Sequence, residues 1–513
     1  MRVIVAMVLC LFLSPFLRAA GKAEQIVLIV WDGMRPDFIT EQFTPTLYKL
    51  AQEGVLFANH HPVFLSATEV NGTAISTGAY PANSGIMANK EYRPRINLLK
   101  PLGTETPEAL RNGDRLTRGR YLNRATLAEI LQGAGHKTAV AGTKGVALLH
   151  DRHERVEDEG RGIVLCSYGT LPTNCWGRLV NDLGLYPTSA IPNVERDSWT
   201  TRALTGPFWK DGLPRFSLLW LSEPDFSQHE TGPGSATSLA ALKSSDSNLA
   251  RVLHELDKRS LRASTDVLVV SDHGFSTIME TVDIAKALQG AGFRATREFT
   301  QPPVNDAILV VSNGGSTLLY VIGHDLKLVQ NVVDFLQSQP FTGVLFTRQP
   351  IEGAFKLEQA RINTPDAPDI LIAHRWSADK SSNGTPGLVF CDDPIRKPGQ
   401  GMHVSLSRFD MHNTLVGAGP DFRRGTVDEL PTGNVDIAPT LLWILGIKPP
   451  GPMDGRVLAE ALTIDGPQVG KPVTSQLRTT RRQTNFIWRQ YLKRTELNGV
   501  IYLDEGNGAA DPR

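Results

Sequence analysis

Short apolar runs that end at an aspartate recur along this chain. The segments "EQIVLIVWDG" and "TDVLVVSDHG" are rich in β-branched residues and short enough to be buried strands, and "FSLLWLSEPDFSQH" begins in the same way. Between two of these runs lies "SLAALKSSDSNLARVLHELDKRS", whose apolar spacing is helical. Strands and helices in alternation predict an open α/β fold with a mostly parallel sheet flanked by helices.

The aspartates after these runs are predicted to meet in space. Asp32, Asp225 and Asp272 each follow a predicted strand, although they lie far apart in the sequence. In open α/β sheets, ligands bind in the crevice outside the carboxyl ends of the strands. The three carboxylates are therefore expected to line one crevice.

The pattern changes after residue 275. Residues 276–398 hold further strands and a helix, among them two strands around the Asn-Gly-Gly turn of "DAILVVSNGGSTLLYVIG". This pattern predicts a small α+β insertion that lies over the crevice as a cap. Residues 399–465 return to the main pattern, with "VDIAPTLLWILGI" as a buried helix. Residues 24–513 are accordingly predicted to form one domain that carries this insertion.

A β-hairpin is predicted near the C-terminus. The segment "NFIWRQYLKRTELNGVIYLDEG" alternates on both sides of Asn498-Gly499, the dipeptide that most strongly indicates a tight hairpin turn. Three arginines precede this segment, and they are expected to lie on a solvated surface stretch: Arg478, Arg481 and Arg482.

The N-terminal segment has the pattern of a secretory signal peptide. In "MRVIVAMVLCLFLSPFLRAAGKAEQ", a basic residue precedes an apolar stretch and then small residues, which predicts a signal peptide over residues 1–23. A retained anchor helix is the alternative, but Pro15 and Arg18 cut the apolar run below the ~20 residues that a membrane span needs. No other segment resembles a span. The chain is therefore expected to be secreted or periplasmic, where Cys166 and Cys175 are close enough in sequence to form a disulfide.

Composition and charge exclude some partners. The chain has 513 residues, with 53 lysines and arginines balanced by 53 aspartates and glutamates. A neutral chain has no net field to attract a nucleic-acid duplex or an anionic membrane. Neither binding to a duplex nor a membrane span after signal cleavage is expected, and no pattern in the sequence indicates an oligomeric state.

Aspartate and histidine together predict a metal site. His229 follows Asp225 by four residues, so one helical turn would direct both side chains to one ion, and His273 is adjacent to Asp272. The full candidate set is Asp32, Asp225, His229, Asp272, His273 and His403. These ligands exceed the needs of one tetrahedral zinc ion, whereas two ions about 4 Å apart would share them and suit phosphoryl chemistry. Taken singly, each aspartate is more often a helix cap and each histidine a surface residue.

The segment "FLSATEVNGTAISTGAYPANSGIMANKEY" contains a candidate nucleophile. The hydroxyl of Thr68 is inert at neutral pH unless a base or a metal ion activates it. A helix beginning there would add amide donors for a phosphate oxygen. The turns that follow are expected to return Asn89 toward Thr68, where its amide could hold a phosphoryl oxygen. The structural alternative is that Thr68 caps a helix and Asn89 is a turn residue.

The chain resembles the alkaline phosphatase superfamily, and within it the type I phosphodiesterase/nucleotide pyrophosphatase family. The resemblance rests on "VLIVWDGMRPDF", "TEVNGTAISTGAYPANSGIMAN", "EPDFSQH", "SDHGF", "GMH" and "VDIAPTLLWILGI", in that order. It implies an alkaline-phosphatase-like catalytic core and two zinc ions, although manganese or iron suits such ligands as well. One ion would be held by Asp32, Thr68, Asp272 and His273, and the other by Asp225, His229 and His403.

The resemblance also implies a mechanism. Thr68 would attack phosphorus in line and form a phospho-threonine intermediate, which an activated water would hydrolyse. Asn89 falls at the family's position for the amide that steadies the phosphoryl oxygen.

The sequence departs from the family pattern at one site. An aromatic motif that many nucleotide pyrophosphatases carry is not evident, and "AVAGTKGVALLHDRH" stands in its place. Lys144 resembles the lysine of related phosphate monoesterases and phosphonoacetate hydrolases, while Val146 stands near the place where those branches often have a second basic residue. Lys144 could read the extra charge of a monoester, or it could be a solvated loop residue. Sulfatases need a modified cysteine or serine, and "TEVNG" has none.

Three functional hypotheses follow. The leading one is a metal-dependent phosphodiesterase or nucleotide pyrophosphatase. The second is a phosphomonoesterase or phosphonoacetate-type hydrolase that uses the same site. The third is a metal-binding module without catalysis, which the presence of both ligands and a nucleophile disfavours.

Overall fold

The computed structural model describes residues 21–153 and 160–513. The predicted signal peptide, residues 1–23, lies almost entirely outside the described residues. Within them, no helix is both long and apolar enough to cross a membrane.

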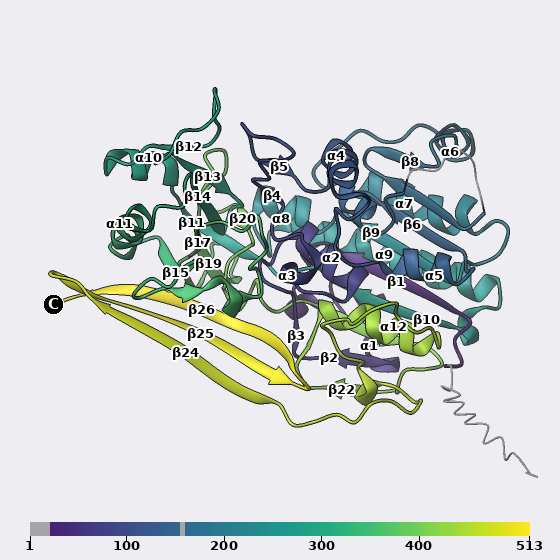
Figure 1. Cartoon of the computed structure of the whole chain (residues 1–513). Coiled ribbons are helices and arrows are strands. Elements are labelled where there is room, and N and C mark those ends of the chain that lie inside the picture. The colour runs from purple at the N-terminus through teal and green to yellow at the C-terminus, as the bar shows by residue number, and fades with distance from the viewer. Residues whose placement is uncertain (1–20, 154–159) are drawn as a thin grey trace, which may run out of the picture.

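A mixed nine-stranded sheet forms the core of the larger lobe (Figure 1). Its strands, in spatial order, are β22 (Thr426–Asp428), β2 (Val55–Phe57), β21 (Leu415–Ala418), β10 (Thr265–Val270), β1 (Gln25–Trp31), β9 (Phe216–Leu221), β6 (Thr138–Gly142), β7 (Gly162–Cys166) and β8 (Gly169–Leu171). The central strands β10, β1, β9, β6 and β7 run parallel. The predicted α/β fold with a mostly parallel sheet is confirmed.

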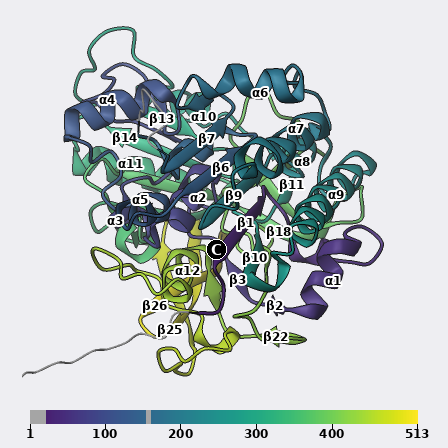
Figure 2. The same ribbon diagram turned by 90° about the vertical axis from the view of Figure 1, so that its right-hand side faces the viewer.

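Helices cover both faces of this sheet (Figure 2). Successive side chains of a strand point to opposite faces, so Leu28 of β1 packs in one core and Ile29 in the other. The first face is covered by α2 (Thr68–Thr77), α5 (Leu127–Gly133) and α12 (Ile437–Ile444). The second is covered by α1 (Pro45–Glu53), α6 (Cys175–Leu183), α7 (Val194–Thr205) and α9 (Ala236–Lys258). The predicted helices α9 and α12 are both present, and burial on both faces explains why the strands are continuously apolar.

A second lobe contains most of residues 276–402. Its six-stranded sheet has the order β12 (Ala295–Thr296), β13 (Ile308–Ser312), β14 (Ser316–Val321), β17 (Ile370–His374), β15 (Thr342–Thr347) and β16 (Phe355–Lys356). Helices α10 (Ile284–Gly290) and α11 (Leu326–Gln337) pack on one face of it. A four-stranded sheet is formed by β18 (Trp376–Lys380), β19 (Pro386–Cys391), β11 (Ser276–Thr281) and β20 (Gly401–Met402). The two strands around the Asn-Gly-Gly turn are confirmed, and the assignment of residues 276–398 as an inserted cap stays a prediction.

The C-terminal strands form a three-stranded antiparallel sheet that runs alongside both lobes (Figure 1). The predicted hairpin joins β25 (Phe486–Leu497) to β26 (Val500–Pro512), and Asn498 and Gly499 both have positive φ, as a type I′ turn requires. The third strand, β24 (Val473–Arg482), carries the three arginines and was not predicted. Its residues are largely exposed, so no apolar alternation marks this edge strand in the sequence.

The three cysteines among the described residues are not paired. Cys166, Cys175 and Cys391 are buried free thiols, so the disulfide that the sequence allowed between the first two is absent. Cys166 is the last residue of β7 and packs in the core, whereas the sulfur of Cys175, at the start of α6, accepts a hydrogen bond from Arg178.

Candidate active site

The three strand-end aspartates converge as predicted. β1 lies between β10 and β9, and all three strands run in the same direction. Asp32 follows β1 and Asp272 follows β10, while Asp225 is the first residue of α8 (Asp225–Thr231), just after β9. All three carboxylates are buried. The sheet topology therefore delivers them to one place, because carboxyl ends of parallel strands share an edge.

One group of ligand atoms forms around the ends of β1 and β10. Oxygens of Asp32 and Asp225 and a nitrogen of His273 lie within 4.8 Å of one another. Nε2 of His273 is 3.6 Å from Oδ1 of Asp32 and 3.2 Å from Oδ2 of Asp272. These side chains are spaced closely enough to share one cation.

A second group forms around α8. Asp225, His229 and His403 offer ligand atoms within 4.8 Å of one another. Nε2 of His229 lies 3.2 Å from Oδ1 of Asp225, one helical turn away, and Nε2 of His403 lies 3.7 Å from the same oxygen. Asp225 thus belongs to both groups, whereas the family resemblance assigned it to one.

Hydrogen bonds orient the imidazole rings of these groups. Nδ1 of His229 lies 3.0 Å from the carbonyl oxygen of Gly401, and Nδ1 of His403 lies 2.8 Å from that of Ser66. Nδ1 of His273 makes the same kind of contact with its neighbour's carbonyl. A ring nitrogen beside a carbonyl oxygen carries the proton, so each Nε2 is presented to the site, as metal-ligating histidines do.

Unsatisfied oxygens show that the site suits cations. Oδ1 of Asp32, Oδ1 of Asp225 and Oδ2 of Asp272 are buried without a hydrogen-bond partner. A buried carboxylate oxygen left unpaired is costly, whereas a coordinated cation would satisfy it. The donor set of carboxylates and imidazoles fits divalent metal ions such as zinc. These buried groups are therefore suited to a metal centre with more than one ion.

Lys144 enters the same site. It follows β6, another parallel strand of the central sheet, and Nζ lies 3.0 Å from Oδ2 of Asp32 and 3.0 Å from Oδ2 of Asp225. Lys144 is thus not a solvated loop residue. Its ammonium stands between two carboxylates that the sequence proposed as ligands.

Burial and neighbouring charges shift the pKa values of these groups in different directions. Burial raises the pKa of Asp32 well above its usual range, and the neighbouring Asp272 adds to this. Burial alone would also raise the pKa of Asp225, but Lys144 and His229 outweigh it and hold that pKa well below its usual range. Burial and the nearby His273 lower the pKa of His403, which keeps its imidazole neutral and able to coordinate.

Thr68 is placed against the first ligand group. It is the first residue of the ten-residue helix α2, and its hydroxyl oxygen lies 3.3 Å from Nε2 of His273. The residue is buried at the point where unpaired amides and the helix dipole favour a negative charge. Its hydroxyl can therefore reach both the ligand group and an anionic phosphate.

Asn89 returns to the same helix end. Its Oδ1 accepts a hydrogen bond of 3.1 Å from the backbone N–H of Glu69, the residue after Thr68. Because that oxygen is engaged, the side-chain NH₂ is the group that Asn89 can offer to a ligand. The turns between residues 78 and 89 position this donor beside the proposed nucleophile, as the sequence suggested.

We expect Asn89→Ala to lower kcat/KM for a phosphate ester by about 10²-fold, since it removes one donor aimed at developing negative charge. Metal content should not change, because Asn89 is not among the ligand atoms. Asn313→Ala is the matched control, because Asn313 is half-buried like Asn89, accepts a hydrogen bond from the backbone of Lys90 nearby and belongs to no ligand group. Equal activity of Asn89→Ala and the control would show that Asn89 does not contribute a hydrogen bond to the reacting phosphate.

Some side chains that support the site were missed in the sequence. Nε1 of Trp220 donates to Oδ2 of Asp32 at 2.8 Å, and the backbone N–H of Gly33 donates to Oδ1 of Asp272 at 3.0 Å. Asn434 donates to the carbonyl oxygen of Asp272 from a distant segment. In the sequence, Trp220 looks like an ordinary core residue of an apolar strand, and Asn434 belongs to no recognisable motif. Gly33 could have been predicted, because it is adjacent to the candidate ligand Asp32.

A cleft of ≈ 610 Å³ opens beside the second ligand group. Asn89, His229 and His403 lie in its wall, together with residues of the second lobe such as Ser312 and Arg396. A substrate group attached to a phosphate at the site would extend into this cleft.

Comparison with known proteins identifies related chains. The family model "Type I phosphodiesterase / nucleotide pyrophosphatase" matches residues 26–390. Bis(5'-adenosyl)-triphosphatase enpp4 of Xenopus laevis is 24% identical over 438 residues, which cover 83% of this chain and 79% of that protein. Human ectonucleotide pyrophosphatase/phosphodiesterase family member 1 is 26% identical over 266 residues, which cover 51% of this chain but only 24% of the human protein.

The fold is also similar to solved structures. Murine ectonucleotide pyrophosphatase/phosphodiesterase 5 superposes with a TM-score of 0.60 at 17% sequence identity, covering 86% of this chain and 100% of that one. The human counterpart superposes with a TM-score of 0.61 at 16% identity over the same shares.

Proposed function

This chain belongs to the type I phosphodiesterase/nucleotide pyrophosphatase family, and from that premise we propose that it hydrolyses phosphate diesters or nucleotide pyrophosphates with Thr68 as its nucleophile. The observation that carries the proposal is the position of the Thr68 hydroxyl, 3.3 Å from Nε2 of His273 and at the start of α2. An alcohol in that position touches both a ligand group and a site for phosphate. From the N-terminal segment alone, we propose a secreted or periplasmic setting.

Two zinc ions are the cofactors that we propose. Asp32, Asp272 and His273, with the hydroxyl of Thr68, would hold one, and Asp225, His229 and His403 would hold the other. Imidazole and carboxylate ligands favour zinc, with manganese and iron as the alternatives that metal analysis would detect. When bound, the ions would lower the pKa of the threonine hydroxyl and neutralise charge on the phosphoryl oxygens.

The residues of the chain divide the reaction into two displacements. Oγ1 of Thr68 gives its proton to solvent and attacks phosphorus in line. The bond to the leaving oxygen breaks, the leaving group departs and takes up a proton from solvent, and one ester group stays on the phosphorylated threonine. Water then attacks phosphorus from the opposite side, and the bond to Oγ1 breaks to regenerate the hydroxyl. In both steps the NH₂ of Asn89 donates to a phosphoryl oxygen, and its hydrogen bond from Glu69 keeps it oriented.

The proposed function is tested by comparing kcat/KM for bis(4-nitrophenyl) phosphate and 4-nitrophenyl phosphate on enzyme of measured metal content. We expect the diester to be preferred. A strong preference for the monoester would reject the phosphodiesterase activity. It would not bear on the proposed nucleophile and metal centre, which a monoesterase would use as well.

The position of Lys144 favours one second candidate, a phosphomonoesterase or phosphonoacetate-type hydrolase. Its Nζ is 3.0 Å from carboxylates of both ligand groups, so an ammonium is present where the additional negative oxygen of a monoester would lie. That charge is less useful for a diester, which has one negative oxygen.

If Lys144 reads this charge, Lys144→Ala should lower monoester turnover about 10- to 100-fold more than diester turnover, as loss of a charged hydrogen bond predicts. Lys90→Ala is the control, because Lys90 lines the cleft but is exposed. An equal loss on both substrates, at unchanged metal content, would show that Lys144 does not select the substrate.

A further inference from the structure

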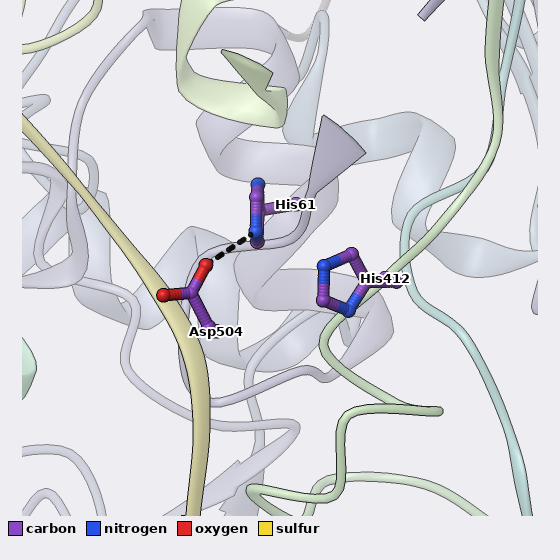
Figure 3. Close-up of side chains that lie close together, drawn as sticks. All are labelled: His61, His412 and Asp504. Carbon is purple, nitrogen blue, oxygen red and sulfur yellow. Dashed lines mark hydrogen bonds and ion pairs between the residues drawn. The ribbon is translucent and has the colours of Figure 1, made fainter. Parts of the chain in front are cut away.

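A third group of potential metal ligands lies apart from the active site. His61, His412 and Asp504 offer ligand atoms within 4.8 Å of one another, and none of them belongs to the two groups described above. They come from three segments that are distant in sequence: β3 (His60–His61), the loop before β21, and β26 of the C-terminal sheet (Figure 3). His61 and Asp504 are buried, whereas His412 is half-buried and can be reached from solvent.

Backbone carbonyls fix the orientation of both rings. Nδ1 of His61 lies 3.0 Å from the carbonyl oxygen of Thr432, and Nδ1 of His412 lies 2.9 Å from that of Arg408. Since a carbonyl can only accept, each Nδ1 carries a proton, and in a neutral ring each Nε2 has a free lone pair. This is the arrangement that protein structures use to present Nε2 to a metal ion.

The contact between His61 and Asp504 requires a positive species. Nε2 of His61 lies 3.1 Å from Oδ1 of Asp504. In the neutral ring both atoms are acceptors and would repel each other, so either a proton or a metal ion must lie between them. A proton would need only these two groups, whereas the third side chain, His412, stands with its ring centroid 4.6 Å from that of His61.

We propose that His61, His412 and Asp504 bind one divalent transition-metal ion of the zinc class, which ties the C-terminal sheet to the catalytic lobe. Two imidazoles and one carboxylate are a zinc-type donor set that leaves a fourth position for water. An ion about 2.1 Å from each ligand holds the ligand atoms roughly 3.4 Å apart, so His61 and Asp504 are already placed for it and His412 has to move slightly inward.

The surroundings of Asp504 support this assignment. Its second oxygen, Oδ2, accepts a hydrogen bond of 3.0 Å from the hydroxyl of Thr495 on β25, which orients the carboxylate toward the histidines. The ion would join β26 to β3, the strand that precedes the Thr68 helix. Its role is therefore structural, and the inference stands whether or not the chain is a phosphodiesterase.

Metal content measured on the full chain tests the proposal. Wild type and His412→Asn would be equilibrated with zinc, freed of loosely bound metal and analysed by mass spectrometry of the metal. We expect His412→Asn to lose one equivalent of zinc per chain relative to wild type, with kcat/KM changed less than about twofold, because the His412 side chain belongs to neither ligand group of the active site.

His324→Asn is the matched control. His324 also pairs with an aspartate, its Nδ1 lying 2.7 Å from Oδ1 of Asp369, but it belongs to no group of three ligands. The positive φ of His324 suits asparagine. The zinc content of the His324→Asn variant should equal that of wild type. Equal zinc content in wild type and His412→Asn would overturn the proposal and leave a protonated His61 paired with Asp504.

A second measurement needs no variant. Diethyl pyrocarbonate modifies free imidazole nitrogens, so zinc should protect His412 in the wild-type chain while modification of His324 stays constant. Modification of His412 to the same extent with and without zinc would also overturn the proposal.

Discussion

Thr68→Ala is expected to lower kcat/KM for a phosphate diester by on the order of 10⁶-fold, the scale at which removal of the covalent nucleophile acts in a serine protease. The hydroxyl of Thr68 approaches a ligand group through the 3.3 Å contact with His273. Alanine keeps the helix and removes that hydroxyl. Bound metal should therefore stay close to the wild-type amount, because the carboxylates and imidazoles remain.

Two further variants distinguish loss of the nucleophilic hydroxyl from a packing defect. Thr68→Ser restores a hydroxyl and should recover part of the activity. Thr73→Ala is the packing control, since Thr73 lies in the same buried helix and its hydroxyl donates to the carbonyl oxygen of Glu69. Near-normal turnover by Thr68→Ala would show that water attacks phosphorus directly and that Thr68 is not the nucleophile.

Asp225→Asn is expected to have the second largest effect, because Asp225 contributes to both ligand groups. The variant should lose at least one metal ion and about 10³-fold in kcat/KM, since a metal ion supplies several kcal/mol of transition-state stabilisation and about 1.4 kcal/mol corresponds to tenfold. Removal of metal from the wild type with a chelator should produce a loss of at least this size, reversed by added zinc.

Asp246→Asn is the control for loss of a buried carboxylate. Asp246 accepts hydrogen bonds from the first backbone amides of α1 and lies outside the ligand groups, so its substitution should lower stability without removing metal. If Asp225→Asn retains full metal content and activity, the ligand groups do not form the centre that we propose.

The central sheet and the convergence of its aspartates were accessible from sequence. Apolar runs of strand length gave β1, β9 and β10, and the rule that ligands bind at the carboxyl ends of parallel strands then brought Asp32, Asp225 and Asp272 together. Strands buried on both faces are continuously apolar, so the apolar run marks the strand and the first charged residue marks its end.

Other features depend on contacts that no local pattern records. β24 is an exposed edge strand, and its pairing with β25 is visible only in three dimensions. The group of His61, His412 and Asp504 is assembled from three distant segments, none of which has a ligand spacing of its own. The resemblance to related phosphate monoesterases singles out Lys144, but only the structure places its Nζ between Asp32 and Asp225.

The configuration at phosphorus tests the covalent mechanism most directly. A phosphorothioate diester with a single configuration at phosphorus would be hydrolysed in ¹⁸O-labelled water, and the configuration of the product determined. Each in-line displacement inverts phosphorus, so attack by Thr68 followed by attack by water predicts overall retention. Overall inversion would mean that a single displacement by water cleaves the ester, and it would contradict the role of Thr68 as the nucleophile.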